Sequence, residues 1–199
     1  MKHLTRGINE NNQLDFHSPY GCSKGSAEQY VRDYSRIYTL QTVVFRQSCI
    51  YGRHQFGIED QGWIAWFTIA ALLNKPIKLY GNGKQVRDVL FVDDLVDLYY
   101  LAITKINKVS GQIYNIGGGQ ANSISILELF DLLKNNHNLK IHYTKHDIRP
   151  GDQKIFISDN SKIGRAIGWK PKVGIKKGVS ELLMWTRENL KLIESLYRH

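Results

Sequence analysis

Apolar and polar positions along the chain change from a helical period to a strand-like period and back. Residues 19–38 carry apolar side chains at helical spacing, and Ser18 followed by Pro19 is typical of a helix start. One face of this predicted helix gathers Ala27, Tyr30, Val31 and Tyr34. Residues 41–52 form a β-branched run that predicts a buried strand. A helix that leads into a buried strand is typical of parallel sheets covered by helices.

The rest of the chain continues this alternation. Further helices are predicted at residues 62–73, 93–106, 123–134, 161–167 and 176–196. Further strands are predicted at residues 76–80, 86–92, 112–116, 141–143 and 154–157. Asp93 and Asp94 are interpreted as helix-start residues rather than catalytic acids. The glycines at 117–119 lack the spacing of a phosphate loop and are interpreted as a structural turn.

Length and composition permit one domain and part of a second. The chain has 199 residues, of which 42% are hydrophobic. Apolar runs stay shorter than the ~20 residues of a membrane-spanning helix, and residues 1–13 lack the apolar centre of a signal peptide. Cys22 and Cys49 lack metal-ligand spacing, as do the histidines. We therefore expect a cytoplasmic protein with reduced thiols, no membrane association and no metal.

The charge of the chain favours an anionic ligand. The net charge is +9, and residues 101–199 hold 16 lysines and arginines against 8 acidic residues. This balance suits nucleic acid or a small ligand with phosphates. The sequence has neither a basic stripe with interleaved aromatic residues nor zinc-finger spacing, so nucleic acid is not expected. Most of the lysines are interpreted as a solvated surface.

Tyr20 and Lys24 lie four residues apart, one turn of the predicted helix, and therefore share a face. A phenol with a pKa near ~10 is a poor base at neutral pH, and a nearby cation lowers that pKa. Such a pair can take or give a proton while a hydride leaves or returns. Tyr80 and Lys84 repeat the spacing across two glycines, in a turn that has no helical face. An ordinary helix start remains the alternative for the first pair.

Five segments then occur in an order that points to a family. They are SPYGCSKGSAEQYVRDY, FRQSCIYG, GNGKQVRDVLFVDDLVDL, YNIGGG and RPGDQK. In this order they resemble the extended short-chain dehydrogenase/reductase family of NAD-dependent nucleotide-sugar epimerases and dehydratases, across residues 7–189. Within that family, residues 54–67, HQFGIEDQGWIAWF, are most similar to the 2-epimerases that turn CDP-paratose into CDP-tyvelose for O-antigen lipopolysaccharide.

The resemblance implies an α/β fold with the C-terminal portion of a Rossmann-type parallel sheet and a small α/β substrate-binding domain. Residues 1–60 would be a remnant of the NAD-binding domain, with the catalytic helix and the strand that follows it. Residues 61–199 would mainly bind the nucleotide sugar, with some strands and helices returning to the Rossmann sheet.

The resemblance also implies roles for individual residues. Tyr20 would be the catalytic acid/base, and Lys24 would lower its pKa and bind the nicotinamide ribose of NAD. The residues beside the nicotinamide would be Arg46, Gln47 and Ser48. The substrate-binding positions would be Cys49, Gly62, Trp63, Tyr80, Arg87 and Arg149.

Within the substrate set, Gly62 and Trp63 would meet the phosphates at a helix N-terminus, and Tyr80 would lie beside the base. Arg87 and Arg149 would clamp the pyrophosphate, because a guanidinium fork matches phosphate oxygens and stays charged. Three alternatives stay open. Arg87 could pair with its neighbour Asp88, Arg149 could be an ordinary surface arginine, and the aromatic side chains near Trp63 could pack a core. Cys49 stands where many relatives have a substrate-binding asparagine.

Two features of the family have no counterpart in this sequence. These are the Gly-x-x-Gly-x-x-Gly turn that cradles the NAD pyrophosphate and a Ser or Thr at the usual distance before the tyrosine. We therefore expect a truncated or split chain. Apolar surface around Tyr20 and residues 43–45 would then be exposed, which predicts marginal stability, aggregation, or a partner such as the N-terminal segment or a second copy.

The predicted function is the C-terminal part of an NAD-dependent nucleotide-sugar epimerase, with a CDP-sugar as the favoured substrate. Another nucleotide-sugar 4-epimerase, a 4,6-dehydratase, and a non-catalytic nucleotide-sugar-binding remnant stay open as alternatives.

Overall fold

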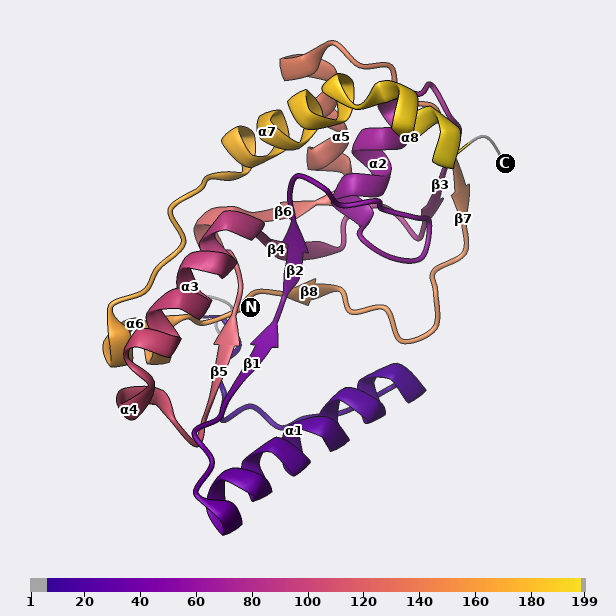
Figure 1. The fold of residues 1–199 in the computed structure, drawn as a ribbon. Coiled ribbons are helices and arrows are strands. Elements are labelled where there is room, and N and C mark those ends of the chain that lie inside the picture. Colours follow the sequence, from indigo (N-terminus) through magenta and orange to yellow (C-terminus); the bar gives the residue numbers. More distant parts are fainter. Residues whose placement is uncertain (1–6, 198–199) are drawn as a thin grey trace.

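A computed structural model describes residues 7–197 as an α/β protein (Figure 1). Its helices are α1 (Pro19–Tyr38), α2 (Trp63–Leu72), α3 (Val92–Thr104), α4 (Ile106–Val109), α5 (Ile126–His137), α6 (Ser161–Ile167), α7 (Ile175–Glu188) and α8 (Leu190–Leu196), with the 3-10 helix η1 (Gln120–Asn122). Its strands are β1 (Val43–Gln47), β2 (Cys49–Tyr51), β3 (Ile77–Tyr80), β4 (Val86–Phe91), β5 (Gln112–Ile116), β6 (Ser123–Ser125), β7 (Tyr143–His146) and β8 (Ile155–Phe156). The predicted α/β class is confirmed.

The first sheet joins β1 and β5 in parallel, with Val43 opposite Gln112 and Gln47 opposite Ile116. Apolar side chains of α3, α4 and α6 form a core against this sheet, and Trp169 closes it by donating its indole N–H to the carbonyl of Asp94 at 3.0 Å. None of the hydrophobic side chains in this core comes from α1. The sheet is therefore covered mainly by α3 and α4, which lie between its two strands in sequence, and by α6, which follows both.

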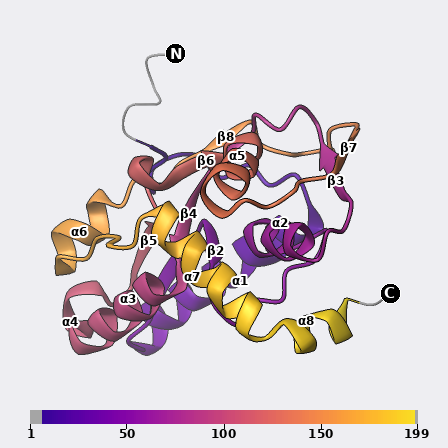
Figure 2. The ribbon, with the colours of Figure 1, turned by 90° about the horizontal axis from the view of Figure 1, so that it is seen from above.

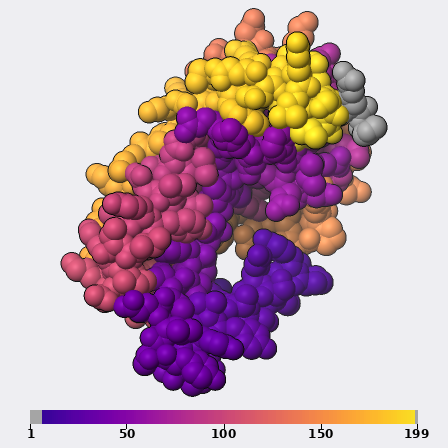
Figure 3. Space-filling view, viewed as in Figure 1, coloured from indigo at the N-terminus to yellow at the C-terminus, as the bar shows by residue number. Residues whose placement is uncertain are grey.

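α1 has the bounds that the sequence predicts and is mostly exposed. Its N-cap is Ser18, whose Oγ accepts a hydrogen bond from the N–H of Gly21 at 3.0 Å. Gly25 and Glu28 are the residues of α1 that are buried. The predicted apolar face at Tyr30, Val31 and Tyr34 is exposed. Figure 3 shows an opening between α1 and the rest of the molecule.

The expected exposure is present on α1 but is wrong in part for β1. Tyr20 is 69% exposed, whereas residues 43–45 are half-buried. The reason is that Phe45 packs against Tyr99 of α3 and Tyr114 of β5, with ring centroids 5.7 and 6.3 Å apart. Helix α3 therefore shields β1 from solvent on one side.

β4 organises the remaining strands. It pairs in parallel with β2 and β8 and antiparallel with β6. β6 was predicted as the start of the helix that follows it, because three residues are too few to show a strand period. Ser125 serves both elements: it pairs with Val86, and its side chain forms a capping box with Glu128 at the start of α5.

A second, larger core lies between β3, β4 and three helices. α2 is apolar on all sides, and α5 and α7 pack beside it (Figures 1 and 2). The helix predicted at 176–196 is wrong as a single element, because it breaks at Asn189 into α7 and α8. A short parallel pair, β3 with β7, extends this half of the molecule.

A fully buried carboxylate, Asp88 on β4, ties the two halves together. Its Oδ1 accepts from the hydroxyl of Ser48 at 2.5 Å, between β1 and β2. Its Oδ2 accepts from the backbone N–H of Gly119 at 3.0 Å and of Ser158 at 3.1 Å. A Cβ at Gly117 would lie 2.1 Å from this oxygen, so the predicted structural turn at 117–119 requires glycine there.

Replacing Asp88 with Asn is expected to lower the free energy of unfolding by about 3 kcal/mol, because a neutral amide offers one acceptor oxygen in place of the two charged oxygens that receive three hydrogen bonds in this buried site. Urea denaturation followed by circular dichroism measures the change. The matched control is Asp93→Asn, an exposed carboxylate that pairs with Arg53 at 2.6 Å. That variant is expected to lose less than about 1 kcal/mol. Equal losses in the two variants would contradict the role of Asp88.

Candidate functional site

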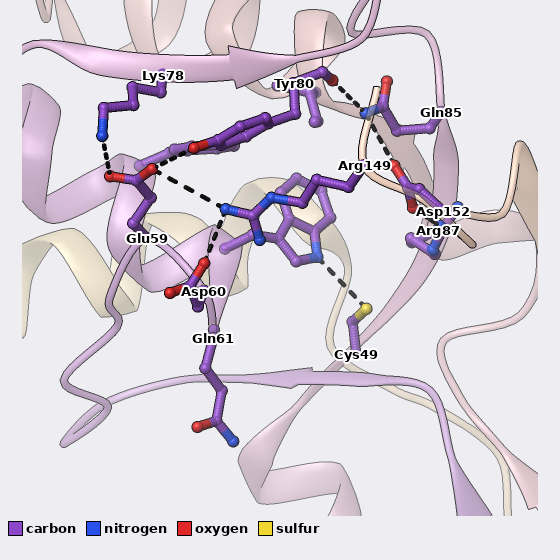
Figure 4. Close-up of a pocket in the computed structure, with 14 residues that line it drawn as sticks. Cys49, Glu59, Asp60, Gln61, Lys78, Tyr80, Gln85, Arg87, Arg149 and Asp152 are labelled. Carbon is purple, nitrogen blue, oxygen red and sulfur yellow. Dashed lines mark hydrogen bonds and ion pairs between the residues drawn. The ribbon is translucent and has the colours of Figure 1, made fainter. Parts of the chain in front are cut away.

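A cavity of about 220 Å³ opens where β2, β3, β4 and the N-terminus of α2 converge (Figure 4). Typical ligand pockets measure roughly 300–1,000 Å³, so the cavity can enclose part of a larger ligand and leave the rest in solvent. Its lining residues are Cys49, Glu59, Asp60, Gln61, Gly62, Trp63, Phe67, Lys78, Tyr80, Gln85, Arg87, Ile126, Arg149 and Asp152. All the residues predicted to bind substrate are among them.

The first turn of α2 forms one wall of the pocket. The helix follows Gly62, which has left-handed backbone angles (φ 74°), and it has no side-chain cap. Its first N–H groups are therefore left without an intrahelical acceptor. The indole N–H of Trp63 donates to the Cys49 sulfur at 3.3 Å. Burial raises the pKa of the Cys49 thiol, which therefore stays protonated and uncharged.

The mouth of the pocket carries a cluster centred on Tyr80 and Glu59. The Tyr80 hydroxyl donates to Glu59 Oε1 at 2.6 Å, and the Lys78 ammonium lies 3.3 Å from Oε2. The hydrogen bond from Tyr80 lowers the pKa of Glu59, so this carboxylate is charged at neutral pH. The guanidinium of Arg149 lies 4.0 Å from the Tyr80 ring centroid and 2.8 Å from Asp60.

Arg87 enters the opposite side of the pocket from β4. Its Nη2 donates to Asp152 at 2.7 Å and its Nη1 to the carbonyl of Val86 at 2.9 Å. The predicted alternative, a pair with the adjacent Asp88, is wrong, because Asp88 turns inward to Ser48 and the backbone. A guanidinium has five N–H donors, so further donors remain for a ligand.

Tyr20 and Lys24 lie on α1, outside this pocket. The Lys24 ammonium lies 5.3 Å from the Tyr20 ring centroid, so the two side chains share a face of the helix. Both are exposed to solvent, and neither lines the cavity. The shared helix face that the spacing of Tyr20 and Lys24 predicts is thus present, and it is open to solvent.

The residues predicted beside the nicotinamide are held by protein partners. Arg46 forms a two-pronged ion pair with Glu28 of α1, at 2.6 and 2.7 Å. The amide of Gln47 donates to the hydroxyl of Tyr99 at 2.5 Å, and Ser48 donates to Asp88. These contacts connect β1 to α1 and α3, and the residue after β1 to β4.

Six polar residues of the pocket were not predicted from the sequence. They are Glu59, Asp60, Gln61, Lys78, Gln85 and Asp152. Glu59 and Asp60 lie within residues 54–67, the segment that resembles the 2-epimerases. That resemblance could have indicated both residues as pocket residues. Asp152 gave no comparable signal, because only the fold brings its loop against Arg87.

Comparisons with known proteins show the family of the chain. Residues 4–117, more than half of the chain, match the NAD dependent epimerase/dehydratase family. The chain belongs to this family. The predicted Rossmann-type relationship and the NAD-dependent class of the relatives are therefore confirmed.

Among curated relatives of the family, CDP-paratose 2-epimerase of Salmonella typhi is 50% identical over 185 residues, which cover 90% of this chain and 55% of that protein. The structure of Pal from Bacillus thuringiensis is 32% identical with a TM-score of 0.83, over 92% of this chain and 57% of that one. MoeE5 in complex with UDP-glucose and NAD is 25% identical with a TM-score of 0.85, over 94% and 61%. The chain spans little more than half the length of these similar proteins.

Two further observations concern the described part of the chain, residues 7–197. No helix there is long and apolar enough to cross a bilayer. No group of three or more potential metal ligands occurs there either.

The two cysteines are expected to react at different rates with a thiol reagent. Cys22 is exposed, whereas Cys49 lies in the pocket wall with a raised pKa. Because the thiolate is the reactive form, one thiol should react quickly and the other more than about tenfold more slowly at pH 8. Absorbance with Ellman's reagent measures both phases, and Cys22→Ser should remove the fast one. Two equally fast thiols would contradict the burial of Cys49.

Proposed function

We propose that the pocket binds the nucleotide diphosphate of a nucleotide sugar, and that the chain is the substrate-binding and acid/base part of a CDP-paratose 2-epimerase. The observation that carries the proposal is the convergence of Tyr80, Arg87 and Arg149 on one cavity at a helix N-terminus. The 50% identity to the Salmonella typhi enzyme supports a CDP-linked sugar over other nucleotide sugars. The product would then serve O-antigen synthesis.

Each group of the pocket has a role in this proposal. Arg87 and Arg149 would hold the two phosphates, with help from the free N–H groups at the start of α2. Each arginine already faces a carboxylate, at 2.7 Å for Asp152 and 2.8 Å for Asp60. Phosphate must therefore compete with these carboxylates, or displace them, when it binds. Tyr80 would lie flat beside the base.

The residues near α1 fit one end of NAD. Lys24 and Tyr20 present an ammonium and a phenol together on an accessible face, as the nicotinamide ribose requires. The described residues contain no Gly-x-x-Gly-x-x-Gly turn for the NAD pyrophosphate. The fit is therefore to the nicotinamide end, with Arg46 and Gln47 on the neighbouring strand β1 and Ser48 directly after it. NAD, when bound, accepts a hydride from the sugar and returns it.

The chemistry of this chain is then proton transfer. Tyr20, with the Lys24 ammonium beside its ring, would take the proton of the C2 hydroxyl as the C2 hydride leaves. The keto sugar would turn over, and Tyr20 would return the proton as the hydride comes back to the opposite face. The C2 configuration is thereby inverted without net oxidation.

We also propose that the chain divides into two parts at residue 60. Residues 7–60 would belong with the NAD-binding part and the later residues mainly with the substrate-binding part. The core of α3, α4 and α6 against β1 and β5 supports the return of later elements to the first sheet. The exposed side of α1 would be covered by an N-terminal segment or a second copy of the chain.

The proposal is tested by assaying CDP-paratose turnover with NAD, on the chain and on its fusion to the N-terminal portion of the Salmonella typhi relative. Replacing Tyr20 with Phe in the fusion is expected to lower kcat by about 100-fold or more, because a positioned acid/base contributes roughly 10²–10⁴. Product is identified by NMR of the released sugar.

The matched control is Tyr30→Phe, a tyrosine of α1 that is 70% exposed against 69% for Tyr20. Its turnover should equal that of the unchanged fusion. Unchanged kcat in the Tyr20 variant would remove that residue from the mechanism. Turnover of UDP- or dTDP-sugars in place of the CDP-sugar would favour a 4-epimerase or a 4,6-dehydratase, and binding without turnover would favour a non-catalytic role.

A further inference from the structure

Glu59 is a charged acceptor placed where a flat ligand would meet the Tyr80 ring. Its carboxylate lines the cavity and is 33% exposed. The Tyr80 hydroxyl occupies Oε1 at 2.6 Å and the Lys78 ammonium lies at Oε2 at 3.3 Å. A carboxylate offers about four lone-pair positions, so about two remain for a ligand. Figure 4 shows Glu59 at the mouth of the pocket with its oxygens toward Tyr80 and Lys78.

The cations around Glu59 already have acidic partners. Lys78 lies against Glu59 itself, and Arg149 is held by Asp60 at 2.8 Å while it lies over the Tyr80 ring. The hydroxyl of Tyr80 points at Glu59 and is engaged as a donor. Lys78 and Arg149 keep further N–H donors, and Arg149 also lies 4.0 Å from Glu59 Oε1. The acceptor positions that remain on Glu59 lie beside the Tyr80 ring.

The free acceptor positions of Glu59 would distinguish the pyrimidine bases. Cytosine and uracil have the same shape, and they differ at position 4, where cytosine carries an N–H₂ donor and uracil a carbonyl acceptor. Glutamate and aspartate accept from the cytosine amine in protein–nucleic acid contacts. Uracil in the same place would set a carbonyl oxygen against a charged carboxylate.

We propose that the Glu59 carboxylate selects cytosine over uracil or thymine in this pocket by accepting a hydrogen bond from the exocyclic amine. This inference rests on the proposed function, since it assumes that the base of a nucleotide diphosphate lies beside Tyr80. The inference names Glu59 as the residue that distinguishes one base from another. Because Tyr80 and Lys78 fix both oxygens of Glu59, the acceptor is held in place before the ligand arrives.

Calorimetric titration of the purified chain with CDP and with UDP tests the inference. The unchanged chain is expected to bind CDP at least about tenfold more tightly than UDP, the scale of one discriminating base contact. Replacing Glu59 with Gln should reduce that ratio to about threefold or less, because an amide offers both a donor and an acceptor at the same position.

Two matched variants control for charge. Asp60→Asn removes a neighbouring carboxylate that binds Arg149. It is expected to alter the affinity for both nucleotides by the same factor and to keep the ratio. Glu181→Gln removes a carboxylate of similar exposure on α7, paired with Arg53 at 3.5 Å, and should change neither affinity.

The outcomes separate the two proposals. Tight binding of both nucleotides with no preference, or a preference for UDP, overturns the role of Glu59 and leaves the nucleotide pocket in place. A CDP preference that survives Glu59→Gln also overturns it and assigns the selection to another group. Absence of binding by either nucleotide overturns both proposals. Thermal melts of each variant identify a loss of binding that comes from unfolding.

Discussion

The buried carboxylate of Asp88 is the constraint on which the rest of the structure depends. It accepts hydrogen bonds from the chain between β1 and β2, from the glycine turn after β5 and from the backbone after β8. These three segments come from distant parts of the sequence. Asp88 therefore fixes how the first sheet meets the strands around β4. Cys49 directly follows Ser48, and Arg87 directly precedes Asp88. The hydrogen bond between Ser48 and Asp88 therefore places Cys49 and Arg87 in the pocket wall.

The charged side chains of the pocket form ion pairs with one another. Glu59, Asp60 and Asp152 face Lys78, Arg149 and Arg87, respectively. Such pairs at a partly exposed surface contribute little stability. They do hold long side chains near the positions where a diphosphate would need them, which lowers the ordering cost of binding. The pocket thus combines a rigid backbone frame with side-chain pairs that a ligand can rearrange.

The sequence predicted the structure best where a local signal was strong. The Ser18 cap and the helical period gave the bounds of α1. The six candidates for substrate binding line one cavity, and their role stays a prediction. Prediction from the sequence failed where distant contacts decide the structure. β6 depends on pairing with β4 rather than on its own three residues, and Asn189 ends α7 within a continuous amphipathic pattern. The partners of Arg46 and Arg87, Glu28 and Asp152, are set by the fold and not by spacing. Exposure of α1 was expected from the family pattern, whereas the cover that α3 gives β1 was not.

The central claim is that the cavity between β2, β3, β4 and α2 receives a nucleotide diphosphate. The most direct measurement is an NMR titration of the ¹⁵N-labelled chain with CDP, followed at the indole N–H signals of the tryptophans. The account predicts that the signal of Trp63, which lines the cavity, shifts on saturation, while that of Trp169, buried in the other core, stays in place. A shift of Trp169 without Trp63, or a titration that moves neither signal, would contradict it.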